Sequence, residues 1–518
     1  MNSAIRTSAQ SGLIVALGFI LPFSGTSPAN AQAISAPAAM SSIREREIKV
    51  DLFAMAGDSM RGREAGTLDE LRASIWTANK LSSIGVKPFG EEATWYQWFN
   101  VRRTRISTIS SSVSIGGHAL TIWQDITPAS NADGEVSAET IFLDNWRDTT
   151  VVIRGRVAVA MLEPTSVGTR TTVNTPEYRA VRQGLSVQGT ALSRRGAAAV
   201  ILIADSLGES AFDLVAAIQS RGSYTVIGGA NRFAPPAPGA QAAPASVPAP
   251  RPVPVLLVHG SSSSALRVNG QAADIRIRTE RFDTPSVNVI GVVRGTDPVL
   301  RDEYVVFSSH QDHDGVRAAV AGDSIWNGAD DNASTSVALF AIARAWVKQP
   351  AKRSAIFIFH GAEERGLLGS LWHAAHPVVP LSKMVALLNG DMMGRNNPDS
   401  ASLLGSQPPH RNSTALVKMA FDANARTGRF VLDSLWDRPT HPEGWYFRSD
   451  HVPYARLGVP ALFFTTNLHP DYHTPRDEPS RIDYPKLTRM TRWMYLTGWI
   501  AANTRAKPEI DQGFRLER

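Results

Sequence analysis

One pattern recurs in the C-terminal half of the chain: a short apolar run is followed directly by acidic residues or histidines. The apolar runs are YVVFSS, SAIFIF, KMVALLN and PALFFT, at residues 304–309, 354–359, 383–389 and 460–465. Short apolar runs of this length predict buried strands. Because charge is costly inside a buried strand, the polar residues must gather where the strands end.

Helical segments alternate with these runs. Residues 334–348 and 484–504 carry apolar residues at three- and four-residue spacing, and a further strand-like run, SVNVIGVV, occupies 286–293. Alternating strands and helices predict an α/β fold with a mixed, mostly parallel sheet sandwiched by helices. Such sheets bind ligands outside the carboxyl ends of their strands.

Five clusters of acids and histidines therefore fall on one edge of the predicted sheet. Carboxylates that gather in one place repel one another and lose hydration, so they need a positive partner. Imidazole and carboxylate ligands without thiolate suit zinc, and a set of this size suits two ions that share a carboxylate and activate a water. The clusters are His310 to Asp314, Asn327 to Asn332, His360 to Glu364, Gly390-Asp391 and Asp471 to His473.

Glu363 and Glu364 stand side by side directly after the SAIFIF run. Adjacent residues at a strand end point in different directions, so one can hold a metal while the other takes a proton from water. The small residues Gly361, Ala362 and Gly366 allow close approach of the backbone. Two acids at a helix start are the plainer interpretation, but the other four clusters favour a metal site.

These clusters resemble the co-catalytic di-zinc peptidases, the family of aminopeptidase Y and the bacterial leucyl aminopeptidases. The likeness is clear over 284–505 and weaker over 45–100, and it implies a zinc exopeptidase fold. Glutamate carboxypeptidase is a more distant relative. The matching blocks are His310-Gln311-Asp312-His313, Gly328 to Ser334, Ala362 to Ser370, Asn389-Gly390-Asp391-Met392 and Tyr472-His473-Thr474-Pro475.

The resemblance implies two zinc ions and five ligands. Spacing alone leaves Asp330 and Asp331 equivalent, and the family motif selects Asp331, next to a cis peptide bond to Asn332. The implied ligands are His310 and Asp391 for one zinc, Glu364 and His473 for the other, and Asp331 as a bridge between them.

Three further residues are implied to act beside the ions. Glu363 would be the base that carries the proton of the water to the leaving amine. Asp312 would orient the imidazole of His310, and Tyr472 would stabilise the oxyanion. The block Arg448-Ser449-Asp450-His451 is interpreted as structural support for the site.

The N-terminal residues predict export. Arg6 precedes an apolar stretch at 11–23, and Ala29-Asn30-Ala31 matches a signal-peptide cleavage site. No later segment has the length and apolarity of a membrane span, so no integral membrane segment is expected after cleavage. The absence of cysteine excludes disulfides and thiolate metal sites. The predicted location is the periplasm or the exterior.

A discontinuous peptidase domain with an inserted region is the predicted domain organisation. The inserted region, residues 104–280, is called the insertion below; it is β-rich and resembles the protease-associated domain of the family. The predicted parts are a signal peptide at 1–31, the peptidase domain at 32–103 and 281–505, the insertion at 104–280 with a Pro- and Ala-rich loop at 234–252, and a C-terminal tail at 506–518.

The predicted activity is that of a zinc aminopeptidase with peptide substrates. Net charge of +6 is spread thinly, so nucleic acid is not an expected partner, and no oligomeric state is predicted. A carboxypeptidase acting on acidic C-termini remains an alternative, for which Arg365, Arg395 or Arg448 could bind the carboxylate. A single-zinc glutaminyl cyclase or a receptor-like relative would lack part of the ligand set, which is complete here.

Overall fold

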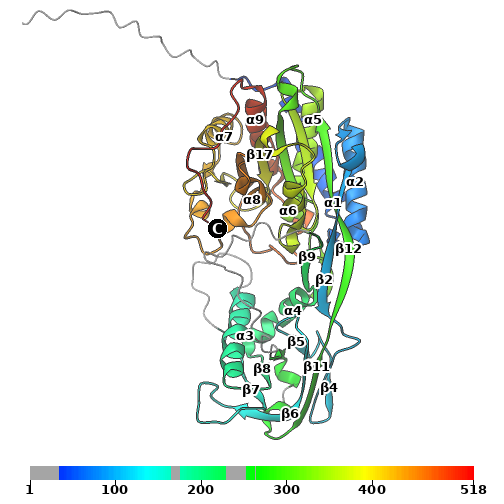
Figure 1. Ribbon diagram of the computed structural model, residues 1–518, viewed down its shortest axis with the longest axis vertical. Coiled ribbons are helices and arrows are strands. Elements are labelled where there is room, and N and C mark those ends of the chain that lie inside the picture. The colour runs from blue at the N-terminus through cyan, green and yellow to red at the C-terminus, as the bar shows by residue number, and fades with distance from the viewer. Residues whose placement is uncertain (1–33, 165–175, 229–252, 263, 518) are drawn as a thin grey trace, which may run out of the picture. The chain divides into compact units, whose positions relative to one another are not determined.

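Two large sheets organise the part of the chain that the structure describes (Figure 1). The computed structural model describes residues 34–164, 176–228, 253–262 and 264–517. The predicted signal peptide and the loop at 234–252 lie outside the described residues.

Ten strands form the larger sheet, in the order β19-β18-β20-β17-β13-β16-β12-β2-β9, with β1 paired to β12. These strands are β19 (Val431–Leu432), β18 (Ser400–Leu404), β20 (Ala461–Thr465), β17 (Met384–Gly390), β13 (Tyr304–His310), β16 (Ser354–His360), β12 (Thr279–Val293), β2 (Tyr96–Ile106), β9 (Ser223–Val226) and β1 (Lys87–Pro88).

The centre of this sheet is parallel and its flanks are antiparallel. Strands β20, β17, β13 and β16 run in one direction, whereas β18 pairs antiparallel with β20, and β12 with β16. The predicted mixed α/β fold is confirmed, although parallel pairing is concentrated in the four central strands. These four are the apolar runs predicted from the sequence, so their polar ends meet at one edge.

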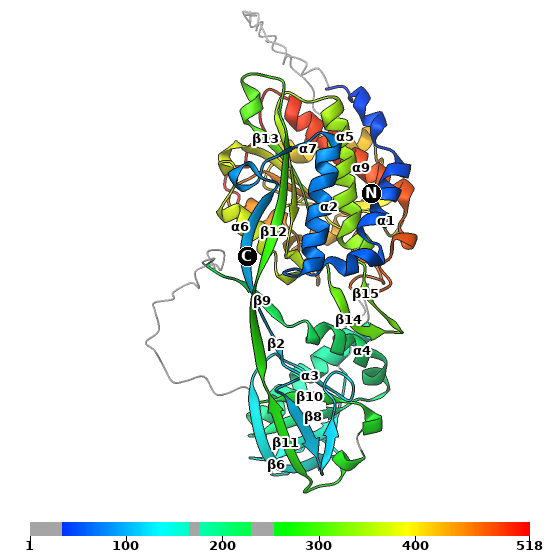
Figure 2. The ribbon, with the colours of Figure 1, turned by 90° about the vertical axis from the view of Figure 1, so that its right-hand side faces the viewer.

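Helices cover both faces of the larger sheet. Figure 2 shows α1 (Glu45–Met55), α2 (Leu68–Ile84), α5 (Thr335–Lys348) and α9 (Tyr484–Asn503) packed together on one side. The opposite face is covered by α6 (Leu368–Ala375) and α8 (His451–Arg456), and α7 (Thr414–Arg426) packs against α9.

Alternate residues of β13 explain the two helical layers. Phe307 contacts Trp346 of α5 edge-to-face, with ring centroids 5.2 Å apart. A Cβ atom at Gly498 of α9 would lie 2.3 Å from the same phenyl ring, so only glycine allows this helix to pack so closely. Val306 points the other way and packs with Tyr454 of α8. This alternation follows from the two-residue period of a strand.

The second sheet lies within the insertion. Its eight strands are β4 (His118–Leu120), β3 (Ser112–Ile115), β11 (Ala272–Ile277), β6 (Gly134–Leu143), β7 (Val157–Met161), β8 (Ala199–Ile203), β10 (Val255–Val258) and β5 (Ile126–Pro128), in that spatial order. Two helices that the sequence analysis missed, α3 (Pro176–Arg194) and α4 (Ser206–Ser220), belong to the same segment.

The insertion also takes part in the larger sheet. Strand β9 falls inside residues 104–280, yet it pairs with β2. Strand β2 in turn pairs with β12 over eleven residues, from Tyr96 opposite Val289 to Ile106 opposite Thr279. The predicted boundaries of the insertion stay a prediction, because both long strands run through them. No helix in the described ranges is long and apolar enough to cross a bilayer.

His373 of α6 provides a test of this packing. Its side chain is fully buried, its Nδ1 hydrogen-bonds to Oη of Tyr454 at 2.6 Å, and burial lowers its pKa to about 3. In the unfolded chain the same group takes up a proton below about pH 6.5. The unfolded state therefore binds more protons between these values, so stability falls as the pH drops through this window.

We expect His373→Gln to weaken this pH dependence. Between pH 7 and pH 4.5, the wild type should lose about 2 kcal/mol more free energy of unfolding than the variant. Urea unfolding at both pH values measures the difference. His376→Gln, at an exposed neighbouring position, should behave like the wild type. Identical losses in wild type and His373→Gln would contradict the prediction.

Candidate metal centre

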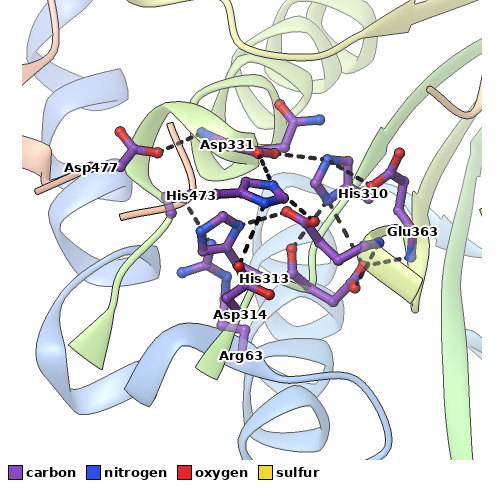
Figure 3. Close-up of polar contacts among 12 residues, drawn as sticks. Arg63, His310, His313, Asp314, Asp331, Glu363, His473 and Asp477 are labelled. Atoms are coloured by element: carbon purple, nitrogen blue, oxygen red, sulfur yellow. Dashed lines mark hydrogen bonds and ion pairs between the residues drawn. The ribbon is translucent and has the colours of Figure 1, made fainter. Parts of the chain in front are cut away.

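The site is built at the carboxyl ends of the four central strands. His310 is the last residue of β13, and Asp391 directly follows β17. Glu363 and Glu364 begin a short helical turn, η8 (Glu363–Arg365), after β16. The structure brings all five predicted ligands and the predicted base to this edge, and Figure 3 shows polar contacts that involve His310, Asp331, Glu363 and His473.

Asp331 lies between two histidines that come from distant parts of the chain. Its Oδ1 is 3.2 Å from Nε2 of His310, and its Oδ2 is 3.1 Å from Nε2 of His473. Each carboxylate oxygen thus faces a different imidazole, which is the arrangement needed for a bridging ligand. The peptide bond from Asp331 to Asn332 is cis, as the resemblance implied.

Two groups of donor atoms surround this carboxylate. In the first, Nε2 of His310 lies 3.6 Å from Oδ1 of Asp391 and 3.7 Å from Oε2 of Glu363. In the second, Nε2 of His473 lies 3.0 Å from Oε2 of Glu364. Within each group, donor atoms lie within 4.8 Å of one another, close enough to share one ion.

The chemistry of the donor set fits zinc. Nε2 of His310, Nε2 of His473 and Oδ1 of Asp391 are buried without a hydrogen-bond partner among the described residues. Buried polar atoms are normally satisfied, so unpaired atoms that converge on one place indicate a missing ligand. Imidazole nitrogens and carboxylate oxygens are common zinc ligands, and no cysteine competes for the ion.

The two adjacent glutamates differ in their protonation behaviour. Burial raises the pKa of Glu363 well above its ordinary value, even though the positive charge of His310 opposes this. Burial acts on Glu364 too, but His473 and His313 outweigh it and hold its pKa well below the ordinary value. Neighbouring carboxyls with opposite shifts are typical of a pair that divides ligand and proton-transfer roles.

Asp312 is placed differently from the expectation. Its carboxylate lies 3.8 Å from Nδ1 of His310, too far for a hydrogen bond, and the imidazole instead contacts the main-chain oxygen of Asp312 at 3.1 Å. The carboxylate accepts hydrogen bonds from the main-chain nitrogens of Glu363 and Glu364, at 3.0 and 3.3 Å. Asp312 thus positions the glutamate pair directly, and His310 only through the backbone.

Asp330 points away from the proposed ions. One of its oxygens accepts a hydrogen bond from the main-chain nitrogen of Gly394 at 2.6 Å, and the other lies 3.4 Å from Nε2 of His469. Asp477 holds the backbone here, accepting hydrogen bonds from the nitrogens of Asp330 and Asp331, each at 3.0 Å. Which of the two aspartates faces the donor groups therefore depends on the backbone geometry, which the spacing of residues in the sequence does not reveal.

Asp314 supports His473 and was not singled out by the sequence analysis. Its Oδ2 lies 3.6 Å from Nδ1 of His473, and its Oδ1 accepts hydrogen bonds from Arg221 at 2.8 Å and Arg365 at 2.9 Å. Burial would raise the pKa of Asp314, but Arg221, His473 and Arg365 together hold it far below the ordinary value. Arg221 directly follows α4, so the insertion contributes to this support.

His313 also joins the second donor group. Its Nδ1 lies 2.8 Å from Oε1 of Glu364. The sequence analysis included His313 in a family block without giving it a role. Its contact with Glu364 orients that carboxylate on the side opposite His473.

A pocket of about 280 Å³ opens onto the donor groups. Leu367, Trp445, Phe447 and Arg448 form its wall beside the metal centre. Tyr472 also lines it, with its ring stacked on that of His473 at a centroid distance of 3.9 Å. The predicted oxyanion role of Tyr472 requires a side chain that reaches the pocket, and this one does.

Arg63 is a buried residue that supports the site, and no pattern in the sequence identifies it. Its guanidinium donates to the main-chain oxygens of Gln311, Asn327, Gly328 and Met55, at 2.7 to 3.0 Å. Three of these oxygens belong to the loops that carry the first two clusters, and that of Met55 lies at the end of α1. Burial lowers the pKa of Arg63 to about 10, so the group stays charged at neutral pH.

Comparisons with known proteins concern the part of the chain that carries this site. Residues 288–497, which contain all five predicted ligands, match Peptidase family M28. Aminopeptidase YwaD of Bacillus subtilis (strain 168) is 25% identical over 272 residues, which cover 50% of this chain and 53% of the relative. Probable leucine aminopeptidase 2 of Aspergillus oryzae is 26% identical over 196 residues, which cover 37% of this chain and 35% of the relative. The chain thus spans about half the length of these curated relatives, or less.

Two solved structures share the fold. BSAP, a zinc aminopeptidase from Bacillus subtilis, superposes with a TM-score of 0.55 at 17% identity, and the matched region covers 91% of this chain and 99% of the BSAP chain. An aminopeptidase from Aneurinibacillus sp. strain AM-1 superposes with a TM-score of 0.53 at 18% identity, and the matched region covers 90% of this chain and 95% of the other. The resemblance to the metallopeptidases that the sequence predicts is confirmed for the matched region.

We expect Arg63→Ala to be strongly destabilising, because it leaves four buried carbonyl oxygens without their donor. The free energy of unfolding should fall by about 3 kcal/mol or more in urea titrations. Arg61→Ala is the matched control, because Arg61 is exposed and its ion pair with Asp69 is long at 3.3 Å. That variant should lose less than about 1 kcal/mol. Equal losses would contradict this supporting role.

Proposed function

We propose that this chain, whose residues 288–497 match Peptidase family M28, is an exported aminopeptidase that works with two zinc ions. The observation that carries the proposal is the carboxylate of Asp331, whose two oxygens lie 3.2 and 3.1 Å from imidazoles in separate donor groups. Two of the similar proteins are named as aminopeptidases, and one of the similar structures is a zinc aminopeptidase, which supports the same reaction.

Five side chains would hold the ions. Bound there, two zinc ions would polarise the scissile carbonyl and lower the pKa of a water molecule. Ser449 donates a hydrogen bond to Oδ2 of Asp391 at 2.8 Å and so leaves its Oδ1 directed at His310. The proposed ligands are His310 and Asp391 for one ion, Glu364 and His473 for the other, and Asp331 for both.

Glu363 would transfer a proton from the attacking water to the leaving amine. Its side chain lines the pocket and borders the first donor group, with Oε2 3.7 Å from Nε2 of His310. In the proposed reaction its carboxylate takes a proton from the attacking water and passes it to the nitrogen of the leaving amine.

The remaining pocket residues would position the peptide. The acids around the ions can hold the positive N-terminal amine of the substrate, which favours an exopeptidase over an endopeptidase. Tyr472 is proposed to donate a hydrogen bond to the oxyanion. The insertion is proposed to be a protease-associated domain, and the predicted signal peptide supports export to the periplasm or the exterior.

We expect Glu363→Gln to lose activity while it keeps its metal. Aminoacyl-peptide hydrolysis should fall roughly 10²- to 10⁴-fold, because the amide cannot accept the proton. Bound zinc, measured by elemental analysis of the same sample, should stay at the wild-type level. Glu91→Gln is the control, because it removes a carboxylate at an exposed position, and it should leave both the hydrolysis rate and the bound zinc unchanged. Full activity of Glu363→Gln would contradict the base assignment.

We expect Asp331→Asn and Asp330→Asn to differ in metal content, although they make the same change at adjacent positions. Asp331→Asn should lose most of its zinc after dialysis against a weak chelator, because it removes a ligand of both proposed ions. Asp330→Asn should retain it, because the carboxylate of Asp330 contacts Gly394 and His469 instead. Elemental analysis of the folded fraction measures the ratio, and the reverse order would exclude Asp331 as the bridge.

A further inference from the structure

Arg448 brings a guanidinium charge to a pocket whose other lining residues are four acids, apolar and aromatic side chains, Gly366 and the proposed zinc ligand His473. It is the one lysine or arginine among the described residues that line this pocket. Of the three arginines that could bind a carboxylate on sequence grounds, Arg365 is engaged with Asp314 at 2.9 Å and Arg395 with Asp471 at 2.6 Å. Neither of these two lines the pocket, which leaves Arg448.

The guanidinium of Arg448 is held in a fixed orientation. Its Nη1 donates to Oε2 of Glu443 at 2.9 Å, and its Nη2 donates to Oη of Tyr472 at 2.8 Å. It also lies over the ring of Trp445, 4.9 Å from the ring centroid. Because Tyr472 stacks on His473, a single aromatic ring separates Arg448 from a proposed zinc ligand.

A second arginine shares the carboxylate that holds Arg448. Arg179 of α3, in the insertion, donates two parallel hydrogen bonds to Glu443, at 2.7 and 2.8 Å. The side chain of Glu443 is only 3% exposed, so little water screens this group. Two guanidinium groups on one carboxylate leave a net charge of +1, and therefore Glu443 does not cancel the charge that Arg448 presents to the pocket.

We infer that Arg448 binds a carboxylate of the peptide substrate, and that Arg179 is a positioning residue acting on it through Glu443. The inference rests on the proposed function and narrows its substrate class. Arginine pairs with carboxylate through charge-assisted hydrogen bonds, which are strong in a partly buried site. The carboxylate has two sources: an acidic side chain on the first residue, or the free C-terminus of a dipeptide.

Peptide pairs that differ only in charge test the inference on the zinc-loaded protein. Glu-Ala-Ala-amide against Gln-Ala-Ala-amide tests the side-chain source, and Leu-Ala against Leu-Ala-amide tests the C-terminal source. In at least one pair, the wild type should cleave the charged member with roughly tenfold higher kcat/KM. Arg448→Gln should abolish this preference, mainly by raising KM for the charged member of the pair.

Variants of the insertion test the positioning role. Arg179→Gln should reduce the preference by a few fold, and Arg179→Lys, which keeps the charge, should restore part of it. Arg182→Gln is the matched control, since Arg182 is an exposed arginine on the same helix that donates to Tyr178. It should keep the full preference. An unchanged preference in Arg179→Gln would remove Arg179 from the inference.

Calorimetry separates this inference from the proposed function. In zinc-loaded Glu363→Gln protein, the charged member of a pair should bind about tenfold more tightly than the neutral one, and Arg448→Gln in that background should equalise them. Equal binding and equal cleavage of both members by protein with Arg448 intact would overturn the inference. If the wild type cleaves no peptide, the proposed aminopeptidase fails, and the calorimetric pair still decides for or against Arg448.

Discussion

The rest of the site depends on the contacts of the Asp331 carboxylate with two imidazoles. This carboxylate brings together His310 at the end of one strand and His473 in a loop more than 160 residues later, with one oxygen toward each. Without a shared anion, two imidazoles and three further carboxylates would form two unconnected groups. The shared carboxylate makes them one centre, and the central parallel strands bring their ends close enough for it to do so.

A layer of buried polar residues surrounds this centre and offsets the unfavourable burial of its charged side chains. Arg63 donates to carbonyl oxygens of both loops that precede the bridge, while Asp477 and Asp312 accept hydrogen bonds from the backbone of the bridge and of the glutamate pair. Burying such charges is unfavourable unless each is paired. Here many of the pairs lie between main chain and side chain, so they fix the geometry of the loops that carry the proposed ligands.

The insertion enters the site at two points. Arg221 at the end of α4 contacts Asp314, which faces the imidazole of His473, and Arg179 of α3 contacts Glu443, which holds Arg448 at the pocket wall. One contact is on the metal side and the other on the substrate side. A segment that carries no proposed ligand can therefore influence both the metal centre and the choice of peptide.

The sequence by itself determined the central strands, the helices that cover them and the edge where the clusters meet, because burial forces periodic apolar runs and expels charge to strand ends. It could not separate Asp330 from Asp331 by spacing, it gave Asp314 no role of its own, and it missed α3, α4, Arg63 and the pairing of Arg179 with Glu443. The roles of Arg63 and Asp314 and the pairing of Arg179 with Glu443 depend on contacts between residues up to 265 positions apart. The helices α3 and α4, in contrast, are amphipathic and carry a local signal, since Asp205 caps the start of α4. Local periodicity reports what a segment buries, whereas the partner of a buried charge is decided only when the loops come together in space.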